Sequence, residues 1–136
     1  MCLHDGDFQS RSSQRSSLAL ALSTRNPKLL QVFRAMHDHI EDPLTLDGLC
    51  DLVNLSRRQM ERYFKRFVGH SPMKAYRNIR LDRARTLVVE TDMSFVEIAT
   101  ACGFNTTAVF SRHYKDRFGI TPSAQLLTKT TPKPTN

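Results

Sequence analysis

The sequence contains no tryptophan and only three cysteines, Cys2, Cys50 and Cys102, among its 136 residues. The cysteines lie far apart and form no Cys-x-x-Cys pair, which argues against a disulfide framework and favours a reducing compartment. The longest apolar run, residues 18–22, is too short to cross a bilayer, and no signal-peptide pattern precedes it. We therefore expect a cytoplasmic protein with no membrane partner, in which Cys50 and Cys102 pack in the core.

Patterns that carry catalysis are also missing. The five histidines have no metal-binding spacing with the cysteines, and His37 and His39 would point to different faces of a helix. There is no glycine-rich phosphate loop and no nucleophile elbow. The sequence predicts a protein that is not an enzyme, with no catalytic residue, no metal site and no cofactor.

Positive charge is abundant. Lys and Arg number 20 against 13 Asp and Glu, which gives a net charge of +7. An excess of this size on a small protein points to a polyanionic partner, either nucleic acid or an anionic membrane face. Charge alone does not choose between them.

Helix patterns account for most of the chain, and no stretch alternates with the period of two that a strand requires. Residues 1–25, rich in Ser and Arg, predict a disordered linker, and residues 128–136 predict a disordered tail. Seven helices are expected between them, and the first is expected to reach residue 40. Their starts are marked by cap residues at Asn26, Thr45, Ser56, Ser71, Ser94, Asn105 or Thr106, and Thr121.

An internal repeat relates the second and third helices to the fifth and sixth. Before the turn the two copies are 49 residues apart, and after the turn they are 50 apart, so one residue is inserted in the second turn. Each copy closes with Gly-x-Ser/Thr-Pro, at residues 69–72 and 119–122. A short helix, a tight turn and a longer helix are typical of a helix-turn-helix unit. We expect two such units, at about 45–68 and about 94–118, joined by a long helix over 72–90.

The longer helix of each unit has a polar face opposite its apolar stripe. The first face carries Arg58, Glu61, Arg62 and Lys65, and the second carries Ala108, Ser111, Arg112 and Lys115. Arg can bind guanine in two-point geometry, Glu can accept from cytosine, and small side chains can meet a thymine methyl group. Two polar faces at equivalent positions favour reading of double-stranded DNA. The alternative is a helical protein-binding module whose charged faces are merely solvated.

Several motifs resemble the signature of AraC/XylS-type regulators. They are Leu81-x-x-Ala84-x-x-Leu87, Ile98-Ala99-x-x-x-Gly103-Phe104, Phe110-Ser111-Arg112-x-Tyr114-Lys115 and Gly119-x-x-Pro122, and the resemblance covers about residues 27–125. It implies an all-α domain of seven helices, with two helix-turn-helix subdomains bridged by a long central helix. It also implies a transcription regulator that binds double-stranded DNA and has RNA polymerase as a second partner.

The resemblance assigns base reading by position to Arg58, Glu61, Arg62, Thr107, Ala108, Ser111 and Arg112. Phosphate contacts are expected from Arg57, Lys65, Arg66 and Lys115. One departure is that Ala108 stands where the first copy has Arg58. Residues 25–27 and 55–62 resemble more narrowly a subgroup with an upstream amidotransferase-like (DJ-1/PfpI-like) domain. That effector-binding domain is expected to be missing from this chain.

Overall fold

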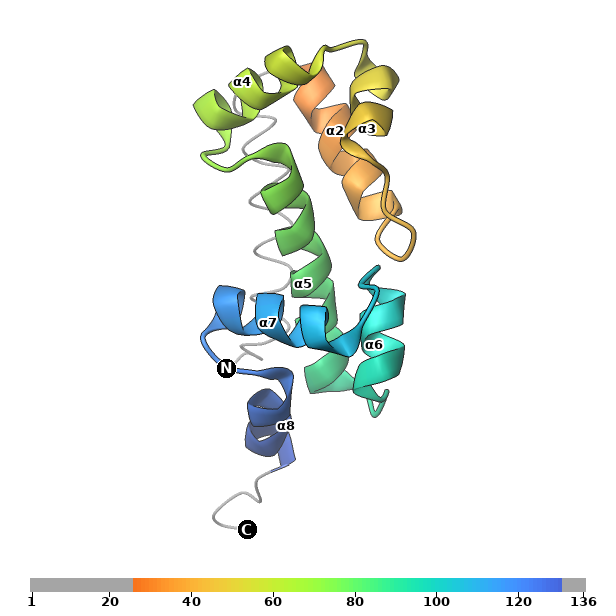
Figure 1. Cartoon of the computed structure of the whole chain (residues 1–136), viewed down its shortest axis with the longest axis vertical. Helices are drawn as coiled ribbons and strands as arrows, with labels where there is room; N and C mark the ends of the chain where they lie inside the picture. The colour runs from red at the N-terminus through yellow and green to blue at the C-terminus, as the bar shows by residue number, and fades with distance from the viewer. Residues whose placement is uncertain (1–25, 131–136) are drawn as a thin grey trace, which may run out of the picture.

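Seven α-helices and no strand make up residues 26–130, the part of the chain that the structure, a computed structural model, describes (Figure 1). The predicted all-α class is therefore confirmed. In chain order the helices are α2 (Pro27–Asp38), α3 (Leu46–Val53), α4 (Arg57–Phe67), α5 (Pro72–Glu90), α6 (Phe95–Ala101), α7 (Thr107–Phe118) and α8 (Pro122–Thr130). The predicted linker, 1–25, and the last six residues of the predicted tail lie outside the described residues.

Most helix starts fall where the sequence predicts them, because a local side chain caps the first turn. Thr45 Oγ1 accepts a hydrogen bond from the amide three residues on (3.0 Å), and Ser71 Oγ does the same (3.2 Å). Ser94 and Glu97 form the predicted capping box, in which each side chain accepts from the other's amide. Such caps satisfy amides that no helical carbonyl reaches, and each contributes about 1 kcal/mol.

Two helix ends differ from the prediction. The first helix stops at Asp38 rather than at residue 40, and the His39 carbonyl accepts a hydrogen bond from the Tyr76 hydroxyl instead. At the other end, α8 continues to Thr130, beyond the predicted start of the tail at residue 128. The Thr128 hydroxyl donates to the carbonyl of Ala124 within α8 (3.1 Å), so the helical turn persists there.

Two hydrophobic cores share the long helix α5. The first half of α5 packs with α2, α3 and α4, and the second half packs with α6 and α7. This division explains why the apolar residues of α5 form no single stripe, since each half faces a different core. Cys50 lies in the first core and Cys102 in the second, both as free thiols, and burial raises the pKa of Cys102 to about 11.

A side chain of α5 holds the turn of the second helix-turn-helix unit. Arg80 Nη1 donates hydrogen bonds to the carbonyl oxygens of Cys102 (3.1 Å) and Gly103 (2.9 Å). Its guanidinium lies over the ring of Phe104, 4.5 Å from the ring centroid. These contacts satisfy two carbonyls at the end of α6 and fix the second turn against α5.

The same part of α5 holds the loop between α2 and α3. The Tyr76 hydroxyl donates to the His39 carbonyl and accepts from the Leu44 amide (2.9 Å). Gly103 brings the second turn against this loop, because a Cβ at that position would lie 2.6 Å from the carbonyl oxygen of Ile40. We call this meeting of α5, the α2–α3 loop and the second turn the subdomain junction. It fixes one helix-turn-helix unit relative to the other.

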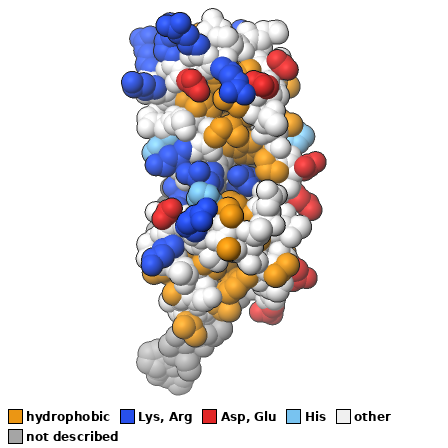
Figure 2. Space-filling model, in the orientation of Figure 1, with side chains coloured by type: hydrophobic (Ala, Val, Ile, Leu, Met, Phe, Trp, Pro, Cys, Tyr) orange, Lys and Arg blue, Asp and Glu red, His pale blue; other side chains and the backbone are white. Residues whose placement is uncertain are grey.

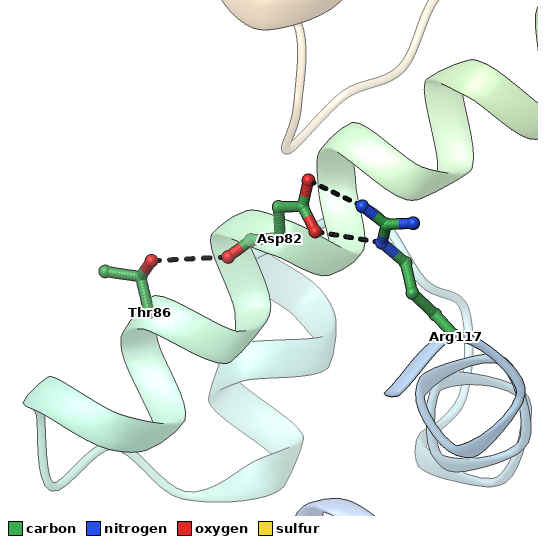
Figure 3. Close-up of polar contacts among 3 residues, drawn as sticks. All are labelled: Asp82, Thr86 and Arg117. Carbon is green, nitrogen blue, oxygen red and sulfur yellow. Dashed lines mark hydrogen bonds and ion pairs between the residues drawn. The ribbon is translucent and has the colours of Figure 1, made fainter. Parts of the chain in front are cut away.

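The C-terminal end of α7 is tied to α5 by an ion pair (Figure 3). Asp82 accepts two hydrogen bonds from Arg117, at Oδ1 from Nε (2.9 Å) and at Oδ2 from Nη2 (3.0 Å). Arg85, also on α5, lies over the ring of Phe118 at 4.9 Å from its centroid. The helix α7 is thus attached to α5 at its end, and the turn before it is attached through Arg80.

Candidate nucleic-acid interface

The helix α4 presents the first predicted DNA-reading face. Ser56 caps the helix, and Gln59 completes a capping box by accepting from the Ser56 amide at Oε1 (2.9 Å). Met60 and Phe64 are fully buried on the inner face, which turns the opposite face to solvent. All predicted site residues of this helix are exposed: Arg57, Arg58, Glu61, Arg62, Lys65 and Arg66.

The helix α7 presents the second face. Thr106 caps it by accepting a hydrogen bond from the amide of Val109 (3.1 Å), and Phe110 and Tyr114 are fully buried on the inner side. Of the predicted site residues, three are exposed and two are half-buried: Ala108, Arg112 and Lys115, then Thr107 and Ser111. The second face therefore offers fewer charged groups than the first.

The two turns differ by one residue, which the structure identifies. Asn54 and Gly103 both have left-handed backbone conformations, with φ of 56° and 81°. The next residue in each copy donates its amide to a carbonyl of the preceding helix, Leu55 to Cys50 (3.0 Å) and Phe104 to Ala99 (2.8 Å). The caps Ser56 and Thr106 follow, so the extra residue of the second turn is Asn105.

The predicted phosphate contacts have unequal surroundings. Arg57 Nε already pairs with Asp47 Oδ1 at 2.7 Å, and this hydrogen bond and charge lower the pKa of the Asp47 carboxyl. Arg66 lies over the ring of Phe67, 5.0 Å from the centroid, with its charge still exposed. Arg57 would have to divide its hydrogen bonds between Asp47 and a phosphate. Lys65, in contrast, has no ion-pair partner among residues 26–130.

The outer faces of α4 and α7 lie at different levels along the length of α5 (Figure 1). In Figure 1, α4 and α7 both run across the direction of α5, α4 near one end and α7 lower down. Figure 2 shows Lys and Arg side chains gathered over the α4 end and over the middle of the same face, where α7 crosses α5. The 19 residues of α5 span about 28 Å.

Within residues 26–130, no helix combines the length and apolar character that a membrane span requires.

Sequence reasoning did not single out the residues that hold these helices in place. Arg80, Asp82 and Arg117 act through contacts between residues more than 20 positions apart, which a motif does not reveal. The sequence did contain one indication of this close packing. Gly103 belongs to the family motif, and its conformation and close approach to Ile40 explain why glycine stands there.

Comparison with known proteins agrees with this fold. A family model of the helix-turn-helix domain matches residues 49–126. The chain is 40% identical over 122 residues to the HTH-type transcriptional regulator GbdR of Pseudomonas aeruginosa. This alignment covers 90% of the chain and 33% of GbdR. It is also 40% identical over 109 residues to ArgR of the same species, with 80% and 33% covered. The chain thus spans about a third of the length of these relatives.

Solved structures lead to the same family. A regulator with an AraC-type DNA-binding domain from Chromobacterium violaceum is 40% identical, with a TM-score of 0.75 over 82% of this chain and 99% of that one. The C-terminal domain of AraT from Geobacillus stearothermophilus is 26% identical, with a TM-score of 0.72 over 82% and 93%. By its fold, its repeat and these matches, the chain belongs to the AraC/XylS family of transcription regulators and carries the family's DNA-binding domain.

Proposed function

We propose that the chain binds double-stranded DNA in a sequence-specific manner and inserts α4 and α7 into successive major grooves on one side of the duplex. The observation that carries this proposal is that equivalent positions form the outer faces of both helices, while their opposite faces fill the two cores. All four positions are exposed on α4 and three of the four on α7, where Ser111 is half-buried. The length of α5, about 28 Å, is close to the 34 Å that separates successive major grooves. One chain can therefore supply both reading helices.

The side chains on the two faces suit different tasks. Arg58 and Arg62 lie one helical turn apart and can each bind guanine O6 and N7, and Glu61 between them can accept from a cytosine amino group. On α7, Arg112 has the same capacity, and Ala108 offers a surface for a thymine methyl group. We assign phosphate contacts to the exposed cations at the far end of each helix, Lys65, Arg66 and Lys115, with Arg57 at the start of α4.

In this proposal the chain regulates transcription in the cytoplasm, with RNA polymerase as a second partner. A relative named transcriptional activator RhaS, from Enterobacter, is 31% identical over 109 residues, which favours activation as the outcome. The upstream amidotransferase-like domain stays a prediction, because the matched part is only about a third of each relative.

The test is selection of bound sequences from a random pool of duplexes, followed by affinity measurements at several salt concentrations. We expect a bipartite consensus with its two halves about one helical turn apart. The logarithm of affinity should fall linearly with the logarithm of salt concentration, by about 0.9 per phosphate neutralised, and Lys65→Ala should lower that slope by about one. A pool with no enriched sequence, or binding that ignores salt, would contradict the proposal.

A further inference from the structure

Two arginines and a histidine come together where α7 crosses α5. They are Arg77 of α5 and the neighbouring residues Arg112 and His113 of α7. The His113 ring lies 6.3 Å from the ring of Phe104, which packs under Arg80 of α5, so the imidazole faces α5. Burial lowers the pKa of His113, and the charges of Arg77 and then Arg112 lower it further. Figure 2 shows Lys and Arg side chains gathered with a histidine in the middle of this face. We call these three residues the crossing cluster.

The two arginines of the crossing cluster differ from Arg80, Arg85 and Arg117 in having no partner. Arg80 is bound to two carbonyl oxygens, Arg85 lies over an aromatic ring, and Arg117 is paired with Asp82. Within residues 26–130, Arg77 and Arg112 make no hydrogen bond, ion pair or ring contact. Like charges held close together repel, and that repulsion is relieved when an anion binds between them.

The position of the cluster identifies the anion. With α4 and α7 in successive major grooves, the sugar-phosphate backbone that separates those grooves passes between the two helices. The crossing cluster lies at that level, and its members come from α7 and from the α5 segment that leads towards the first subdomain. Arginine matches phosphate in two-point geometry, and protonated histidine adds a further donor.

We propose that Arg77 and His113, beside the base-reading Arg112, form a third DNA-contacting surface, which binds backbone phosphate between the two grooves read by α4 and α7. This inference rests on the proposed function and adds two residues, Arg77 and His113, that the repeat does not mark. Arg112 keeps its base-reading role, and its positive charge adds to the attraction for phosphate. The surface carries no base information and fixes how the two reading helices sit on the duplex.

Binding at this surface is coupled to protonation of His113. In the free protein the charges that face the imidazole are Arg77 and Arg80 from α5 and Arg112 and Asp116 from α7, of which only Asp116 favours the protonated form. A bound phosphate adds negative charge beside the imidazole and raises the pKa of His113. The complex then takes up a proton, so DNA affinity rises as pH falls through the pKa of His113 in the complex and levels off only below its lowered pKa in the free protein.

The experiment measures binding of the whole chain to its selected duplex by fluorescence anisotropy. Arg77→Gln is expected to weaken binding by about tenfold and to lower the salt slope by about 0.9. His113→Gln should remove most of the pH dependence. The matched control is Arg83→Gln, which removes the same charge from an exposed position of α5 and should change neither quantity appreciably.

A chemically altered duplex isolates the phosphate contact from any effect on folding. Neutral methylphosphonate linkages are placed one at a time in the backbone between the two half-sites. At the contacted position the modification should weaken wild-type binding and leave Arg77→Gln unchanged. If Arg77→Gln stays sensitive at every position, or matches Arg83→Gln on the natural duplex, the inference is overturned while sequence-specific binding by wild type still stands. If wild type selects no sequence at all, the proposed function fails first.

Discussion

Asp82 and Arg117, 35 residues apart in the sequence, form a two-point ion pair that joins α5 to the last turn of α7. The side chains are 15% and 28% exposed, so water only partly screens the pair. Because α7 carries the proposed second reading face, this pair helps to fix the angle at which that face is presented.

Removing the Asp82 charge should loosen that attachment. We expect Asp82→Asn to lower the free energy of unfolding by about 1–2 kcal/mol, since it weakens two charged hydrogen bonds that are partly open to solvent. Denaturant unfolding measures the loss. Asp116→Asn removes the same charge from an exposed position of α7 and serves as the control. Equal stability of the two variants would contradict a role for the pair in holding α7.

Two glycines separate the cost of backbone conformation from the cost of close packing. Gly103 and Gly119 have nearly the same φ, 81° and 82°, but a Cβ at Gly119 would meet nothing within 4 Å. We expect Gly119→Ala to cost about 1–2 kcal/mol of stability through its left-handed backbone alone. Gly103→Ala should cost about 1–3 kcal/mol more, because its methyl group would strike the Ile40 carbonyl. Similar losses in denaturant unfolding would mean that the subdomain junction yields easily.

Base reading is tested with one arginine from each face. Arg62→Ala should cost about 1–3 kcal/mol on the selected duplex and relax the preference at one or two base pairs. Arg112→Ala should act about one helical turn of DNA away, on the same side. Both variants should keep their fold and most of their affinity for unrelated duplexes. Equal losses on every sequence would instead assign both arginines to the backbone.

The first core supports the first reading face. Phe64 is fully buried, and its ring centroid lies 5.5 Å from that of Phe33. Phe64→Ala should lower the free energy of unfolding by about 3–5 kcal/mol and abolish specific binding by unfolding the first unit. Leu127→Ala, at a position that is 69% exposed, is the control. Unchanged thermal stability in Phe64→Ala would show that the core tolerates the cavity.

Sequence reasoning succeeded where the determinants are local. The start of α5 at Pro72 and of α6 after Ser94 follows from caps and a capping box within four residues. The core positions Met60 and Phe64 follow from helical spacing, which also leaves the reading face outside. The predicted roles of that face stay predictions, since exposure alone assigns no contact.

The rest depends on how distant segments meet. The change of offset from 49 to 50 indicated an insertion, but only the positions of the caps identify Asn105 as the extra residue. Directly after the first helix, the carbonyl of His39 accepts a hydrogen bond from Tyr76, more than 30 residues away. No local pattern encodes such a partner, because the tertiary arrangement has to form before the contact exists.

The unlike turns and faces of the two units have a consequence for the genome. A two-fold symmetric dimer binds a palindromic site, whose sequence is the same on both strands, so the site has no direction. A single chain has no such symmetry, because its α4 face is rich in Arg whereas its α7 face carries Ala108. In the proposed complex, the order of the two half-sites sets which way the protein faces along the chromosome. Inverting the site in place would turn the regulator towards the other neighbouring gene.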